Sequence, residues 1–172
     1  YEERGAAQLV GATEGDPDAT AVSDPEVAVQ LFTMAARVYE EDLGAVDAAV
    51  GHYRRVLEID PDNLHAAESL ERIFRSTERY DELSGALQLK ANIVEGLNDK
   101  KASLFQAASI EEDVLDRPDA ATQVYRKILE LDGEDLRAID ALVKLYLAHS
   151  RWTELLAVYT QKAELVLDPE EK

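Results

Sequence analysis

The chain has 172 residues, enough for one ordinary domain or for several stacked repeats of a few tens of residues each. Hydrophobic residues make up 46% and charged residues 31%, a globular composition without the long uncharged stretch that a membrane span requires. Acidic residues number 36 against 18 basic ones, and the formal net charge of −18 opposes contact with phosphate backbones and anionic lipids. We therefore expect neither nucleic acid nor membrane as a partner.

The first 27 residues differ in character from the rest of the chain. Residues 1–13 are compatible with a helix, whereas residues 14–20 combine acidic residues with the breakers Gly15 and Pro17 and predict a loop. We predict that residues 1–27 are the remnant helix of a preceding degenerate repeat followed by an acidic loop, and that residues 28–172 form a repeat domain.

From residue 28 onward, apolar residues recur at the spacing of amphipathic helices, and no stretch alternates with a period of two. Comparing the sequence with itself at a shift of about 72 residues aligns roughly 21 identities over about 67 positions, which indicates a repeat array. Tyr53 and Tyr125 are one such pair, and Lys90 and Lys162 are another. Each unit divides into two helix pairs, so we predict four repeats near residues 28–63, 64–99, 100–135 and 136–170.

Short breaker segments separate the predicted helices. They lie at residues 60–63 (Asp-Pro-Asp-Asn), at residues 132–135 (Asp-Gly-Glu-Asp) and at Arg117-Pro118, where proline or glycine ends one helix and an acidic or amide side chain caps the next. Helices joined by such short turns lie antiparallel and adjacent. The fold class is therefore all-α, an α-solenoid of about four antiparallel helix pairs stacked into a right-handed superhelix with one concave face.

The second helices carry a spacing known from a repeat family. The matching positions are Ala49, Tyr53, Val56 and Pro61 in one repeat and Ala121, Tyr125, Ile128 and Gly133 in another. This spacing resembles the tetratricopeptide repeat, and the whole of residues 28–170 is most similar to long acidic tetratricopeptide arrays of bacterial proteins. Two features depart from that family: Lys90 and Lys162 stand where a small residue is usual, and the turns after Leu43 and Leu115 carry an extra residue.

Small and large residues alternate at the expected helix contacts. Ala36, Ala49, Ala108 and Ala121 allow close helix approach, while Tyr53, Phe74, Tyr125 and Tyr146 fill the wider gaps. We expect all eight to be buried.

The resemblance implies a peptide groove lined by the first helix of each pair. Its inward positions select a candidate partner-binding set: Arg37, His65, Arg72, Arg75, Phe105, Arg137 and Lys144. Five of these are basic in a chain with a twofold excess of acids, which favours a groove that pairs with acidic side chains of an extended peptide. The alternative is that these cations form ion pairs along or between helices with Glu68, Asp140 and their neighbours.

No residue pattern indicates catalysis, a metal or a cofactor. His52, His65 and His149 lack metal-ligand spacing, there is no cysteine, and no glycine-rich phosphate loop or nucleophile motif is present. We expect a protein that is not an enzyme and that uses no cofactor. The compartment is not fixed by the sequence, and a cytoplasmic location is favoured.

Two functions follow. The first is an interaction scaffold that binds a protein or peptide segment, one that is acidic where it meets the groove or basic where it meets the outer face. The second is a structural spacer or self-assembly module that stacks end to end through apolar terminal faces. For the last helix we expect Leu155, Leu156, Val158, Tyr159, Val166 and Leu167 to lie uncovered.

Overall fold

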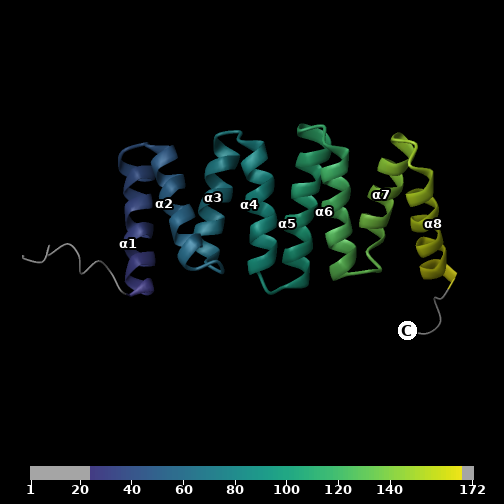
Figure 1. Cartoon of the computed structure of the whole chain (residues 1–172), viewed down its shortest axis with the longest axis horizontal. Helices are drawn as coiled ribbons and strands as arrows, with labels where there is room; N and C mark the ends of the chain where they lie inside the picture. The colour runs from purple at the N-terminus through teal and green to yellow at the C-terminus, as the bar shows by residue number, and fades with distance from the viewer. Residues whose placement is uncertain (1–23, 168–172) are drawn as a thin grey trace, which may run out of the picture.

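The computed structural model describes residues 24–167, so the helix expected over residues 1–13, the acidic loop over residues 14–20 and the end of the fourth predicted repeat lie outside the described residues. Within residues 24–167 the chain forms eight α-helices and no strand. The helices stand side by side in one row, each running opposite to its neighbours, as Figure 1 shows. They are α1 (Pro25–Arg37), α2 (Val46–Ile59), α3 (Leu64–Ser76), α4 (Tyr80–Ile93), α5 (Leu97–Ser109), α6 (Pro118–Leu131), α7 (Leu136–Ala148) and α8 (Trp152–Leu167).

Helices α3, α6 and α7 begin at the positions that the breakers predict. The Asn63 side chain accepts a hydrogen bond from the backbone N–H of Ala66, and Asp135 accepts one from Ala138, both at 3.0 Å. These two bonds satisfy N–H groups that have no partner inside helices α3 and α7. Proline occupies the first position of α6, where its missing N–H removes nothing.

Two π-helical turns, η2 (Val38–Asp42) and η3 (Ile110–Val114), extend α1 and α5. A π turn accommodates one extra residue within a helix. The sequence predicted an extra residue in the turns that follow Leu43 and Leu115. In the structure the extra residue lies before these two leucines, within the π-helical turns η2 and η3. The following residues, Gly44 and Asp116, both have positive φ, 61° and 52°.

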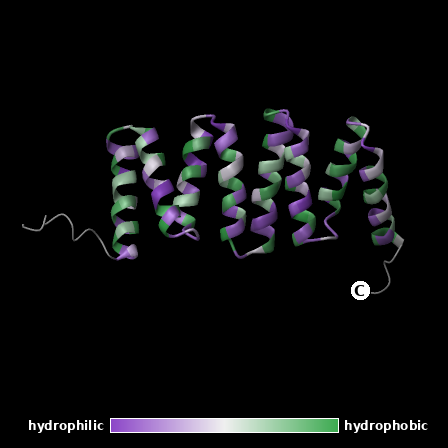
Figure 2. Cartoon of the chain, viewed as in Figure 1, coloured by the Kyte–Doolittle hydropathy of each residue, from purple (hydrophilic) through white to green (hydrophobic). Residues whose placement is uncertain are grey.

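Helix contacts run between neighbours in sequence, which is the arrangement of a solenoid. Each helix carries both hydrophobic and hydrophilic residues, as the colours in Figure 2 show, and the buried hydrophobic residues form one core that runs along the row. The alternation of small and large residues is confirmed: Ala36, Ala49, Ala108 and Ala121 are fully buried, and Tyr53, Phe74, Tyr125 and Tyr146 are also buried. Small side chains let paired helices approach, and the aromatic rings fill the remaining space.

The prediction for the last helix is partly wrong. Leu155 and Val158 are buried because they lie on the face of α8 that belongs to the core shared with α7. Leu156, Tyr159 and Val166 are exposed as expected, and the side chain of Leu167 lies outside the described part of the chain. Sequence alone could not separate the buried from the exposed set, because an apolar stripe of i, i+3 and i+4 residues on one helix is wide enough to face two directions.

Candidate functional site

The seven predicted residues come from the first helix of each pair: Arg37 from α1; His65, Arg72 and Arg75 from α3; Phe105 from α5; Arg137 and Lys144 from α7. We call the surface that carries them the first-helix face. Contacts between side chains join α3 to η2, α3 to α5 and α7 to η3 across this face. The residues therefore belong to one continuous surface along the row.

Two equivalent clusters, each of a tyrosine, a glutamate and a cation, recur on this face 72 residues apart. In the first, the Tyr53 hydroxyl donates to Glu40 Oε2 at 3.3 Å, and the Arg72 guanidinium binds both Glu40 oxygens, with Nη2 at 3.0 Å from Oε2. The bond to Glu40 raises the pKa of Arg72. This fork geometry is a strong form of ion pair because two parallel N–H groups meet one carboxylate.

In the second cluster, the Tyr125 hydroxyl donates to Glu112 Oε2 at 3.1 Å, and Lys144 Nζ donates to Glu112 Oε1 at 2.9 Å. Burial raises the pKa of Tyr125 to about 12, and the charge of Glu112 adds to this rise. The hydrogen bond to Glu112 raises the pKa of Lys144. The two acceptor glutamates, Glu40 and Glu112, lie on the π-helical turns η2 and η3. Each cluster is therefore found beside one of the two turns that contain an extra residue.

Sequence reasoning left both glutamates out of the candidate partner-binding set. The signal was present, because Glu40 and Glu112 align in the 72-residue comparison and flank the extra residue of each turn. The partners expected for the cations were Glu68 and Asp140, but these acids lie against Lys90 (3.2 Å) and Lys162 (2.5 Å) instead. The two lysines that depart from the family pattern thus have carboxylate partners.

The other candidate residues are arranged less uniformly. Arg75 bridges Glu71 on its own helix, at 2.9 Å, and Gln106 on α5, at 2.8 Å. Arg37 lies 3.7 Å from Glu41, and His65 is exposed, with its ring in T-shaped contact with the ring of Tyr53. The ion-pair alternative is therefore realised for Arg37, Arg72, Arg75 and Lys144.

Phe105 is buried, only 8% exposed, and the Arg137 guanidinium lies 4.0 Å from the centre of its ring. A cation at this distance over a ring face is favourable. Phe105 therefore forms the floor of the first-helix face beneath Arg137, and Arg137 itself is exposed.

A hollow of about 490 Å³ opens on the first-helix face beside α3. We call it the α3 hollow; Glu68, Glu71, Arg72, Arg75, Ser76 and Lys90 line it. Partial burial of Lys90 opposes its charge, but its bonds to Glu71 and Glu68 outweigh this and raise its pKa. Three cations and two carboxylates line the hollow, and Glu40, which binds Arg72, adds a third carboxylate beside it, so the charges of the hollow balance in an otherwise acidic chain.

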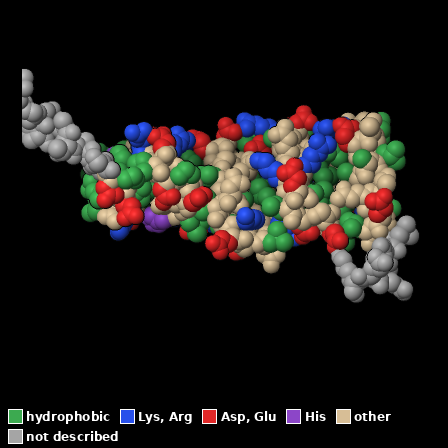
Figure 3. All heavy atoms as spheres, turned by 60° about the horizontal axis from the view of Figure 1, so that its bottom comes forward, with side chains coloured by type: hydrophobic (Ala, Val, Ile, Leu, Met, Phe, Trp, Pro, Cys, Tyr) green, Lys and Arg blue, Asp and Glu red, His purple; other side chains and the backbone are tan. Residues whose placement is uncertain are grey.

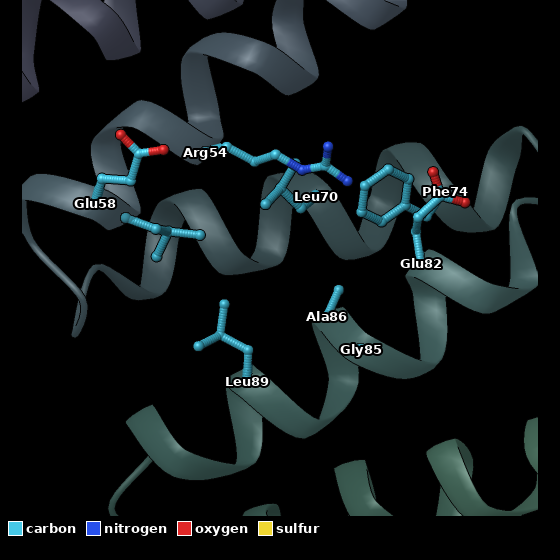
Figure 4. Close-up of a pocket in the computed structure, with 9 residues that line it drawn as sticks. Arg54, Glu58, Leu70, Phe74, Glu82, Gly85, Ala86 and Leu89 are labelled. Atoms are coloured by element: carbon cyan, nitrogen blue, oxygen red, sulfur yellow. The ribbon is translucent and has the colours of Figure 1, made fainter.

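A second hollow, of about 450 Å³, lies between α2 and α4 over α3, and Figure 4 shows its lining. Leu70, Phe74, Ala86 and Leu89 make it apolar, with Arg54 and Glu82 among its polar lining residues. Gly85 adds to the opening because no atom lies within 4 Å of where its side chain would begin. No sequence pattern indicated this hollow.

Residues 24–167 contain neither a metal site nor a membrane span. No group of three or more His, Asp or Glu side chains in this range is arranged to hold a metal ion. None of the helices in the same range combines the length and the apolar character needed to cross a membrane.

The family model of the tetratricopeptide repeat matches residues 30–67 and 138–172. Among solved structures, the chain is similar to a mutant of the protein MamA, with 25% identity over 88% of this chain and 81% of that chain and a TM-score of 0.44. It is also similar to YrrB, described as a TPR protein with an unusual peptide-binding site, with 15% identity over 91% of this chain and 77% of that chain and a TM-score of 0.45. A third is PilF of Pseudomonas aeruginosa, with 15% identity over 86% of this chain and 63% of that chain and a TM-score of 0.44.

These likenesses carry no functional argument, because the TM-scores are low. A comparison with curated proteins found no match. The family matches fall in both halves of the row of helices, so these two segments match the tetratricopeptide repeat.

Proposed function

We propose that this chain is a non-catalytic interaction scaffold that binds an extended, acidic segment of a partner protein along the first-helix face. The observation that carries the proposal is the exposure of the cations on this face. Although each has a carboxylate partner, the side chains of Arg37, Arg72, Arg75 and Lys144 remain 51–74% exposed. A set of exposed cations on one face is unexpected in a chain of net charge −18.

The hydrogen-bonding capacity of these cations supports the proposal. A guanidinium has five N–H donors and an ammonium has three, and Arg72 and Lys144 use only part of that capacity on Glu40 and Glu112. A partner carboxylate can therefore add to each cation without displacing the glutamate below it. The glutamates and tyrosines hold the cations in place, which lowers the entropy lost on binding.

The repeat supplies the length of the surface. Because the two clusters of tyrosine, glutamate and cation are equivalent and lie one repeat unit apart, an extended segment meets the same chemistry twice. The α3 hollow lies beside the first cluster and offers room for a partner side chain. The remaining acidic surface repels acidic segments, so binding is confined to this face.

The test is fluorescence anisotropy with a labelled peptide in which glutamates alternate with serines. The comparison peptide carries glutamine in place of glutamate. We expect binding of the first peptide only, with affinity that falls as salt rises, because exposed ion pairs are screened.

The double variant Arg72→Ala/Lys144→Ala should weaken this binding at least tenfold. The matched control, Arg55→Ala/Lys127→Ala, removes the same charge from α2 and α6 and should leave it unchanged. Equal binding of both peptides, or equal loss in both double variants, would exclude the first-helix face as the binding surface.

The cytoplasmic location favoured by the sequence is part of the same proposal. The second candidate function, a spacer or self-assembly module, is supported by a separate observation at the two ends of the row.

A further inference from the structure

The first and last described helices each expose an apolar stripe. On α1 the stripe consists of Val27, Leu31, Met34 and Val38 at its end, and on α8 it consists of Trp152, Leu156, Tyr159 and Val166. Hydrophobic side chains are visible at both ends of the molecule in Figure 3. The spacing of four, three and four residues along α1 places its stripe on one side of the helix, and the α8 stripe keeps the same spacing from 152 to 159. No element within residues 24–167 covers either stripe.

The junction between α4 and α5 is the internal counterpart of these open ends, because it joins the two 72-residue units of the row. At this junction α4 buries Ser84, Leu87 and Ala91, spaced on one face, against α5 and η3. The residues 72 positions later on α8 are Leu156, Tyr159 and Ala163, and all three are exposed. The exposed face of α8 therefore corresponds to the face of α4 that packs against α5, but within residues 24–167 no helix packs against it.

Part of the α1 stripe, Leu31 and Val38, is the complementary half, whereas Asp99 and Gln106, the α5 equivalents of Val27 and Met34, are exposed at the internal junction. Ser103 and Ile110 are buried on the α5 side of the internal junction. Their equivalents 72 positions earlier, Leu31 and Val38, are 52% and 47% exposed. An α1 helix placed against an α8 helix would thus continue the row in the way that α5 continues it after α4.

Polar contacts at the internal junction are replaced in matching pairs at the open ends. Ser84 donates to Glu111 at 2.6 Å, Arg117 binds Asp81 at 2.5 Å, and Lys127 donates to Gln88 at 2.8 Å. The equivalent pairs between α8 and its neighbour would be Leu156 with Tyr39, Thr153 with Ala45, and Thr160 with Arg55. In the first pair, Leu156 and Tyr39 replace Ser84 and Glu111, and in the second, Thr153 and Ala45 replace Asp81 and Arg117, so neither pair retains a charged residue. In the third pair, Arg55 already binds Glu58 within its own chain. No charge would be buried without a partner, which is the main penalty for a wrong junction.

We propose that a second copy of this chain packs its α1 face onto the α8 face, head to tail, in the arrangement that α5 takes on α4. The larger side chains at this contact make it more apolar than the internal junction and set the helices slightly farther apart. The contact is centred on Leu31 and Val38 on one copy and on Leu156 and Tyr159 on the other, none of which belongs to the candidate set of the first-helix face. Because the two surfaces differ, the contact is heterologous, so the chain forms concentration-dependent filaments, or rings where the curvature of the row closes them.

Net charge sets the condition under which the assembly forms. Two copies of charge −18 repel each other at low ionic strength, whereas burial of the apolar stripes is insensitive to salt screening. We expect association to strengthen as sodium chloride rises. An assembly held by ion pairs would weaken under the same change.

The experiment is sedimentation velocity over a hundredfold range of protein concentration. Leu31→Glu blocks the α1 face and Leu156→Glu blocks the α8 face, and both positions are exposed, so neither change removes core packing. Leu97→Glu is the matched control, since Leu97 is 47% exposed at the start of α5, in the middle of the row. Circular dichroism confirms that each variant remains folded.

We expect wild type and Leu97→Glu to associate and each of the other variants alone to be monomeric. An equimolar mixture of Leu31→Glu and Leu156→Glu should form a one-to-one dimer, because each retains the face that the other lacks. A wild type that is monomeric throughout would overturn the proposal. So would association of Leu31→Glu alone, since that result means that two α8 faces pair with each other.

Discussion

The ion pair between Arg72 and Glu40 separates a structural role of the first-helix face from a binding role. Replacing Arg72 by alanine removes both guanidinium bonds to Glu40 and leaves the Tyr53 hydroxyl as the only other side chain bonded to that carboxylate within residues 24–167. The two partners differ in exposure: the Arg72 side chain is 60% exposed and the Glu40 side chain only 13%. Removing Arg72 therefore costs stability mainly because Glu40, which is largely buried, loses its charged partner.

The size of the effect follows from that asymmetry. An exposed ion pair contributes about 0–1 kcal/mol to stability, whereas a largely buried polar group without a partner costs about 1–3 kcal/mol. We expect Arg72→Ala to lower the free energy of unfolding by about 1.5 kcal/mol. The matched control is Arg55→Ala, because Arg55 and Glu58 form an ion pair whose side chains are 61% and 58% exposed. This control should lose less than about 0.5 kcal/mol.

Urea unfolding followed by circular dichroism measures both changes. A double-mutant cycle that combines Arg72→Ala with Glu40→Ala should give a coupling energy of about 1 kcal/mol, because the Tyr53 contribution cancels between its two arms. If Arg72→Ala costs no more than Arg55→Ala, the cluster does not hold the first-helix face together. Peptide binding by the folded Arg72→Ala variant would then report on recognition alone.

Three further predictions concern the helices that support this face. Truncating the buried ring in Tyr53→Ala should cost about 3–5 kcal/mol in urea unfolding; a loss below about 1 kcal/mol would contradict its place in the core. Gly44→Ala should destabilise the fold by about 1 kcal/mol because Gly44 has a φ of 61°. Gly51→Ala should stabilise the fold by about 0.5–1 kcal/mol because Gly51 lies inside α2 with open space around it. Changes of the same sign in both variants would refute the backbone argument. Because the pKa of Tyr125 rises from 10.0 to about 12 on folding, its proton stabilises the fold below pH 10 and this contribution is lost as pH rises toward 12. Wild type should therefore lose about 2 kcal/mol relative to Tyr125→Phe between about pH 9 and pH 12, and parallel curves for the two proteins would contradict the burial of this hydroxyl.

Two site features were beyond prediction from the sequence. Inward spacing on the first helices identified residues that do share one face, but it could not show that Phe105 lies beneath Arg137 or that Arg72 binds Glu40. Arg72 and Glu40 are 32 residues apart, so their contact depends on how far one helix pair slides and rotates on the next. Periodicity within a helix says which side a residue is on, and carries no information about the neighbour that meets it.

Local residue patterns were enough to define the helices, their order and the helix ends at residues 60–63, 117–118 and 132–135. Apolar spacing, the caps at Asn63 and Asp135 and the short turns between them act over a few residues, and short turns leave adjacent helices no arrangement other than antiparallel contact. The packing of each helix pair on the next was needed to show which carboxylate holds each exposed cation, and that α8 buries Leu155 while it exposes Leu156. The burial of a side chain and the identity of its ion-pair partner depend on both of the surfaces that pack together. The residue pattern of one helix describes only the surface of that helix.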